Sequence, residues 1–92
     1  MEAEFMQAVK RVFGLETIDC SVDWKSNLYG IQLGIDCERF SDAQQLHQHL
    51  GLSSRAHAMG VYFICLRCRG EKAFAFSPDY VLRVYKPKPD NN

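Results

Sequence analysis

Apolar and polar residues alternate along residues 17–37, and this pattern limits the fold more than any other feature of the chain. A period of two predicts strands that bury one face. Residues 17–24 and 29–37 carry the alternation, and residues 25–28 between them supply a turn. We therefore expect an antiparallel hairpin whose register places apolar side chains opposite one another. The expected pairs are Trp24 with Tyr29, Val22 with Ile31, Cys20 with Leu33, and Ile18 with Ile35.

Two other segments have the periodicity of a helix. Residues 2–13 place an apolar stripe on one side, with acidic residues at the start and basic residues at the end, as the helix dipole favours. Residues 41–51 begin with Ser41 and Gln44 at the spacing of a capping box, and Gly51 is expected to end this helix.

The apolar patterns in the second half of the chain predict three more strands. Residues 61–68 are apolar on both faces at first, which is typical of a central strand. A short helical turn at residues 55–59 is expected before it, and a tight turn at Gly70 and Glu71 after it. Residues 73–76 and 80–86 are expected to form the last two strands.

These elements predict a single α+β domain over residues 1–86. The expected order is α-β-β-α-β-β-β, with two helices and a mostly antiparallel sheet. A length of 92 residues is sufficient for one domain and leaves no room for a second. Residues 87–92 contain two prolines and are expected to form an extended or disordered tail.

The two halves of the chain carry opposite charge although the formal net charge is zero. Residues 1–46 hold four basic and eight acidic side chains, and residues 47–92 hold seven basic and three acidic ones. Such asymmetry indicates charged macromolecular partners. We expect two separate binding faces, one acidic on the outward side of the first hairpin and one basic at the turn and edge of the later strands. The candidate binding residues are Asp19, Asp23 and Asp36 for the acidic face and Arg67, Arg69, Lys72, Arg83 and Lys86 for the basic face.

The basic residues of the second half lie among aromatic ones. Lys72 precedes Phe74, and Arg83 lies between Tyr80 and Tyr85. This arrangement favours phosphate contacts combined with base stacking, as in proteins that bind RNA or single strands. Lys and Arg that keep an exposed strand edge in solution would give the same pattern. The sequence leaves both interpretations open.

Four cysteines raise the question of a metal site. Cys65 and Cys68 have C-x-x-C spacing, but residues three apart on a strand point to opposite faces. In the expected register Cys20 and Cys37 lie roughly 13 Å apart, too far to share an ion. We expect structural thiols, and no metal or cofactor. A small zinc-stabilised interaction module is the alternative.

Several other classes of protein are disfavoured. The sequence has no nucleophile loop, glycine-rich phosphate loop or carboxylate pair in an apolar setting, so we do not expect an enzyme. The amino terminus has no basic segment that leads into an apolar run, and the longest apolar stretch, residues 61–66, is far shorter than the ~20 residues that a membrane span requires. We expect a cytoplasmic protein with no membrane partner and no small-molecule substrate.

Residues 45–53 resemble the first helix and turn of a helix-turn-helix, and a predicted hairpin follows where a wing would lie. Three residues depart from that pattern. His47 replaces the small residue where the helices cross, His57 replaces a branched apolar one, and Gly60 interrupts the recognition helix. A winged-helix-like DNA-binding regulator is therefore a second hypothesis.

Taken whole, the chain resembles the small phage-encoded anti-CRISPR proteins that inhibit the type I-F crRNA-guided surveillance complex. The resemblance covers all 92 residues, from the opening Met-Glu-Ala-Glu-Phe-Met-Gln to the tail Lys-Pro-Lys-Pro-Asp. That family shares no catalytic signature, so no functional residue is carried over by position.

The resemblance implies a stoichiometric, non-enzymatic inhibitor in the cytoplasm of a bacterial host. It would bind Cas protein subunits of the complex, with guide RNA as a further contact, and prevent target DNA from binding or hybridising. The charge pattern is compatible with this role. The acidic residues suit basic nucleic-acid-binding surfaces, and the basic residues suit guide RNA or acidic protein.

Overall fold

A mixed sheet of four strands forms the centre of the fold in the computed structural model, which describes residues 3–85. β1 (Cys20–Asn27) and β2 (Gly30–Cys37) are antiparallel. β2 and β3 (Val61–Cys68) are parallel, and β3 and β4 (Glu71–Phe76) are again antiparallel. The helices are α1 (Ala3–Val12), α2 (Phe40–His47), α3 (Leu50–Ala58) and α4 (Pro78–Tyr85).

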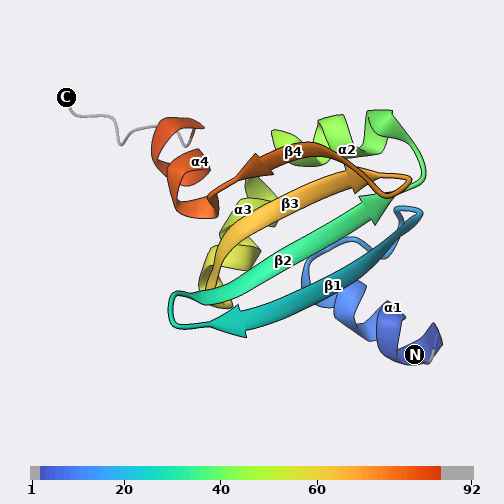
Figure 1. Cartoon of the computed structure of the whole chain (residues 1–92), viewed down its shortest axis with the longest axis horizontal. Helices are drawn as coiled ribbons and strands as arrows, with labels where there is room; N and C mark the ends of the chain where they lie inside the picture. Colours follow the sequence, from blue (N-terminus) through green and yellow to red (C-terminus); the bar gives the residue numbers. More distant parts are fainter. Residues whose placement is uncertain (1–2, 86–92) are drawn as a thin grey trace.

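The helices leave one face of the sheet uncovered. Figure 1 looks onto this open face, with α2 and α3 behind the sheet and α4 beyond the end of β4. The core lies between the sheet and the helices, because β2 and β3 send their apolar side chains to that side. It includes Leu33, Ile35, Ile64 and Leu66 from the strands and Ala43, Leu46, Leu52 and Ala56 from α2 and α3.

The fold is α+β, but the predicted element order is wrong. The order is α-β-β-α-α-β-β-α, with four helices rather than two. The predicted strand at residues 80–86 is helix α4 as far as Tyr85. Pro78 suits a first helical turn, Ser77 Oγ accepts a hydrogen bond from the Tyr80 amide at 3.4 Å, and Asp79 pairs with Arg83 one turn later at 2.9 Å. Lys86 and the predicted tail at residues 87–92 lie outside the described residues.

The single helix predicted at residues 41–51 is two helices. α2 ends at His47, and α3 begins at Leu50, with two residues between them. His49 starts α3, because its Nδ1 accepts a hydrogen bond from the Leu52 amide at 3.0 Å. Gly51, the expected helix end, lies in the first turn of α3, where a Cβ atom would lie 2.7 Å from the His49 ring. The short turn predicted at residues 55–59 is the second half of this helix.

The register of the first hairpin also differs from the prediction. Cys20 lies opposite Cys37, Val22 opposite Ile35, and Trp24 opposite Leu33. Each predicted partner is displaced by four residues, because the turn is formed by Leu28 and Tyr29 alone. An even displacement leaves every side chain on its expected face, so apolar alternation cannot distinguish the two registers.

The sheet is mixed because α2 and α3 return the chain to the end where β2 began. β3 therefore runs parallel to β2, as a helical crossover requires. The second hairpin turns at Arg69 and Gly70, both with positive φ (51° and 84°), and not at Gly70 and Glu71 as predicted. Two positive φ angles characterise the turn type that best matches strand twist.

The start of the parallel pairing gives the first testable prediction. Gly30 has φ of 123°, and a Cβ atom there would lie 2.6 Å from the Gly60 carbonyl oxygen, which accepts a hydrogen bond from the Ile31 amide at 3.0 Å. We expect Gly30→Ala to lower the free energy of unfolding by about 3 kcal/mol or more, since backbone strain and a backbone clash add.

Gly70→Ala is the matched control, because Gly70 also has a positive φ but no atom within 4 Å of the added Cβ. It should cost only about 1–2 kcal/mol. Urea unfolding of both variants measures the difference. Equal losses would contradict the importance of the Gly30 contact with Gly60.

Candidate binding surface on the open face of the sheet

One end of the open face is rich in aromatic side chains. The turn of the first hairpin exposes Leu28 and Tyr29, whose surfaces are 99% and 79% accessible. Tyr29 lies beside Tyr62, with ring centroids 6.0 Å apart, and Asn27 donates a hydrogen bond to the Tyr62 hydroxyl at 2.8 Å. Two large apolar residues at the tip of a turn are unusual for a protein surface and indicate a contact site.

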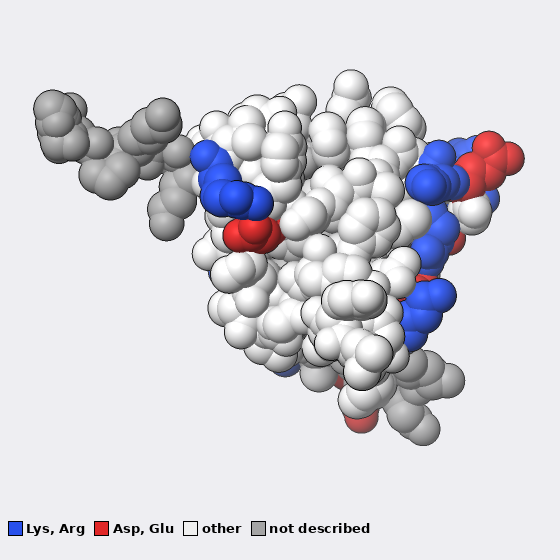
Figure 2. Space-filling view, turned by 60° about the vertical axis from the view of Figure 1, so that its left-hand side comes forward, with Lys and Arg blue, Asp and Glu red and all other residues white. Residues whose placement is uncertain are grey.

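Tyr29 and Tyr62 border an open hollow of about 690 Å³. Figure 2, in which this end of the molecule comes forward, shows a broad face of uncharged side chains with charged groups toward its margins. The sequence contained a signal for this site, because Leu28 and Tyr29 occupy a turn where polar residues are usual. The hollow is lined by Tyr29, His57, Gly60, Val61, Tyr62, Phe63, Ser77 and Asp79.

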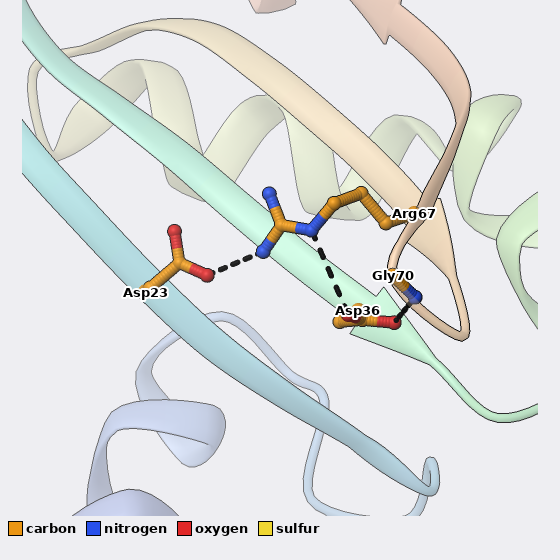
Figure 3. Close-up of polar contacts among 4 residues, drawn as sticks. All are labelled: Asp23, Asp36, Arg67 and Gly70. Carbon is orange, nitrogen blue, oxygen red and sulfur yellow. Dashed lines mark hydrogen bonds and ion pairs between the residues drawn. The ribbon is translucent and has the colours of Figure 1, made fainter.

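The other end of the open face is charged, and Arg67 is at its centre. From β3 the guanidinium reaches across β2 and donates a hydrogen bond to Asp23 on β1 (Figure 3). Its Nε also lies 3.7 Å from Oδ2 of Asp36 on β2. One cation thus joins three neighbouring strands through two carboxylates.

Gly34 provides the space for this bridge. It lies on β2 beneath the ion pair and is buried there. A Cβ atom at this position would lie 2.5 Å from Oδ1 of Asp23 and 2.9 Å from Nη1 of Arg67. The side chain of Arg67 can therefore lie flat over β2 only because residue 34 has none.

Burial and charge act in opposite directions on the pKa of Arg67. Burial favours the neutral form, whereas the hydrogen bond and charge of Asp23 and the charge of Asp36 favour the cation, and together they raise the pKa. The side chains of Arg67 and Asp36 are about one quarter exposed, while that of Asp23 is 66% exposed. Asp23 therefore keeps an oxygen accessible to a partner.

Asp36 also holds the turn of the second hairpin. Its Oδ1 accepts a hydrogen bond from the Gly70 amide at 3.1 Å (Figure 3). Arg69, beside it, donates from its Nε to the Glu38 carbonyl at 3.3 Å and from its amide to the Cys37 carbonyl at 3.0 Å. Side chains and backbone together fix this turn against the end of β2.

The candidate binding residues do not form two separate faces. Asp23, Asp36 and Arg67 meet in one cluster, and exposed Lys72 lies opposite Arg67 in the register of β3 and β4. The expectation of separate acidic and basic faces was wrong, because the sequence did not show that β2 and β3 are neighbouring strands. Asp19 is exposed just before β1.

Arg83 lies at the other end of the sheet. It is on α4, which begins after the end of β4, and β4 extends roughly 17 Å from the turn at Arg69. It pairs with Asp79, which also lies 3.8 Å from His57 on α3. The predicted basic face is therefore divided between the two ends of the sheet. Lys86 lies outside the described residues.

The cysteines and histidines do not assemble a metal site in the part of the chain that the structure describes. No group of three or more His, Cys, Asp or Glu side chains among residues 3–85 has a metal-binding arrangement. Cys65 borders a hollow with Arg67 on the open face, whereas Cys68 lies opposite buried Cys37. The predicted separation of Cys20 and Cys37 is wrong, because these residues are direct cross-strand neighbours.

The segment that resembles a helix-turn-helix forms the end of α2 and the start of α3. His47 stacks on Phe74, with ring centroids 4.3 Å apart. α3 buries Leu52, Ser53 and Ala56 and exposes Arg55 on another side. Both α2 and α3 therefore pack against the sheet.

Comparison with known proteins leaves the chain without a family assignment. No protein-family model matches it, and neither a curated protein nor a solved structure is significantly similar. Among the described residues, no helix has the length and apolar character that crossing a bilayer requires.

The Arg67 bridge gives a prediction on stability. We expect Arg67→Met to lower the free energy of unfolding by about 1–2 kcal/mol, because Asp36 loses its counter-charge while exposed Asp23 is simply rehydrated. Lys72→Met removes a cation from the same face and should stay within about 0.5 kcal/mol of the unmodified protein. If chemical denaturation shows equal losses for both variants, the bridge has no structural role.

A third prediction concerns pH. Burial, followed by the nearby Cys20, Asp42, Cys68 and Asp36, raises the pKa of Cys37 from 9.0 to about 12. The unfolded chain therefore ionises this thiol first, and its contribution to stability is present below about pH 9 and lost between there and pH 12.

Alkylation measures this difference directly. At pH 9.0 the folded protein should expose on the order of a thousandth of Cys37 as thiolate, so iodoacetamide should modify it at least ~100-fold more slowly than in the unfolded chain. Half-buried Cys65 is the internal control. Equal rates in the folded and unfolded states would contradict the expected protection.

Proposed function

We propose that this protein is a non-enzymatic phage inhibitor that binds a crRNA-guided CRISPR surveillance complex and blocks target DNA binding or hybridisation. Two independent lines support this proposal. One is the whole-chain resemblance to inhibitors of the type I-F complex. The other is the character of the open sheet face, which suits a protein or nucleoprotein partner better than a small substrate.

The combination of two zones on one uncovered face carries the proposal. Leu28 and Tyr29 offer exposed apolar area at one end, and Asp23, Arg69 and Lys72 offer exposed charge at the other. Binding energy at protein interfaces concentrates in aromatic anchors, while surrounding charges give orientation and specificity. A face that has both is suited to docking.

Charge of both signs suits a ribonucleoprotein in particular. Exposed Asp19 and Asp23 complement basic surfaces that otherwise hold nucleic acid, and Arg69 and Lys72 complement guide RNA or acidic protein. Cas protein subunits are thus the proposed partners, with guide RNA as a further contact.

Stoichiometric binding fits the described side chains better than turnover does. The three histidines take part in local contacts: His47 stacks on Phe74, His49 starts α3, and His57 lies near Asp79. Burial raises the pKa of both Cys20 and Cys37, which disfavours the reactive thiolate.

A purified type I-F surveillance complex with bound crRNA tests the function. We expect the protein to co-elute with the complex and to abolish the mobility shift of target duplex DNA at near-stoichiometric amounts. Absence of co-elution would contradict the proposal. Binding of the isolated protein to duplex DNA with steep salt dependence would instead support the winged-helix-like regulator. Stoichiometric zinc in the purified protein would support the metal-stabilised module.

Two variants test the two zones separately. Tyr29→Ala should weaken association with the complex at least ~10-fold by removing an aromatic anchor. Arg69→Glu combined with Lys72→Glu should have an effect of similar size through charge reversal. Arg11→Glu, an exposed charge reversal at the end of α1, is the control and should leave affinity unchanged. Unchanged affinity in both test variants would place the interface elsewhere.

A further inference from the structure

Three thiols lie side by side on the face of the sheet opposite to the proposed binding surface. The register places Cys20 of β1 opposite Cys37 of β2, and Cys37 opposite Cys68 of β3. Direct cross-strand partners project to the same face, and Cys37 projects into the core. Cys65 belongs to the other face.

The backbone between Cys20 and Cys37 has the geometry that a disulfide requires. The Glu38 amide donates a hydrogen bond to the Asp19 carbonyl at 3.2 Å, so Asp19 and Glu38 form a hydrogen-bonded pair. Pair types alternate along an antiparallel ladder, so the adjacent pair Cys20 and Cys37 is non-hydrogen-bonded. The Cα atoms of such pairs are ~4.5 Å apart, within the ~4.4–6.8 Å range of disulfides.

We propose that Cys20 and Cys37 are a thiol-oxidation site that closes to a reversible disulfide between β1 and β2. In this register the spacing of the pair already suits a disulfide, so closure needs no change of strand pairing. The Cys68 thiol is directed elsewhere, since its Sγ lies 3.8 Å from the Glu38 carbonyl oxygen at the end of β2. The oxidant is a low-molecular-weight disulfide, RSSR.

Accessibility sets the order of the steps. Cys20 lies half-buried on an edge strand, whereas Cys37 is fully buried, so the oxidant reaches Cys20 first. The Cys20 thiolate attacks one sulfur of RSSR, the R–S–S–R bond breaks, and RS⁻ leaves. The Cys37 thiolate then attacks the Cys20 sulfur of the mixed disulfide, and the second RS⁻ leaves.

The reaction is balanced between the protein and the oxidant. Two protein thiols lose two electrons and become one disulfide. RSSR gains these two electrons, and the two protons released by the protein thiols convert the two leaving groups to RSH. A dithiol reductant reverses the reaction.

The surroundings of both thiols make closure slow at neutral pH. Burial raises the pKa of Cys20, Lys10 of α1 opposes this, and Asp19 and Asp42 reinforce it. Around Cys37 the charges of Cys20, Asp42, Cys68 and Asp36 add to burial. Because thiolates are the attacking species, the rate of closure should rise with pH.

The test uses the full chain with excess oxidised glutathione at alkaline pH, followed by alkylation and tryptic digestion. Cleavage after Arg11, Lys25 and Arg39 places Cys20 and Cys37 on different peptides. We expect these two peptides to be joined, the intact mass to fall by two hydrogen atoms, and the free thiols to decrease from four to two. Dithiothreitol should restore all four.

Matched variants identify the pair. Cys65→Ser alters a thiol of the open face and should still give the linked peptides. Cys20→Ser alters a half-buried residue of an edge strand at the border of the core, and it should abolish the link. A link between Cys37 and Cys68, or glutathione adducts without any link in the unmodified protein, would falsify the assignment.

Thermal unfolding provides a second readout, which compares the oxidised and reduced forms of the unmodified protein. The disulfide closes a loop in the unfolded chain, so the oxidised protein should have a higher Tm than the reduced protein. The difference should be absent in Cys20→Ser. Equal Tm values for a protein shown to carry the link would overturn the inference that the native register accommodates it.

Discussion

The parallel pairing of β2 with β3 is the contact on which the rest of the molecule depends. Within residues 3–85 it is the only strand pairing that joins the two hairpins. It aligns Leu33 and Ile35 with Ile64 and Leu66, and α2 and α3 cover this layer. The same alignment on the other face brings Asp36 next to Arg67. The pairing of β2 with β3 therefore forms both the core layer on one face and the contact of Asp36 with Arg67 on the other.

The sequence predicts individual elements better than their arrangement. The predicted α1 and β3 are confirmed, because the apolar stripe and the apolar run have clear boundaries. The strand predicted at residues 80–86 was wrong, since a short apolar segment fits both periods until Pro78 and the spacing of Asp79 and Arg83 are considered. The hairpin register was wrong because an even shift preserves every buried face.

The residues of the candidate site were likewise predicted better than their arrangement. Asp23, Asp36 and Arg67 were each selected from the sequence, but their contact depends on which strands are neighbours, and local patterns do not contain that information. The opposite applies to Leu28 and Tyr29. Their exposure follows from a two-residue turn, so a correct register would have revealed it. Errors in topology and in register therefore concealed different parts of the surface.

The Arg67 bridge also shapes the electric field around the molecule. The negative first half and the positive second half of the chain suggest a strong dipole, but the fold brings Asp23 and Asp36 against Arg67. Two carboxylates beside one guanidinium leave a single net negative charge, so the cluster contributes less to the far field than its separate residues suggest. Beyond the Debye length of about 8–10 Å this remaining charge is screened. At this end of the open face a charged partner is therefore oriented by short-range contacts more than by long-range attraction.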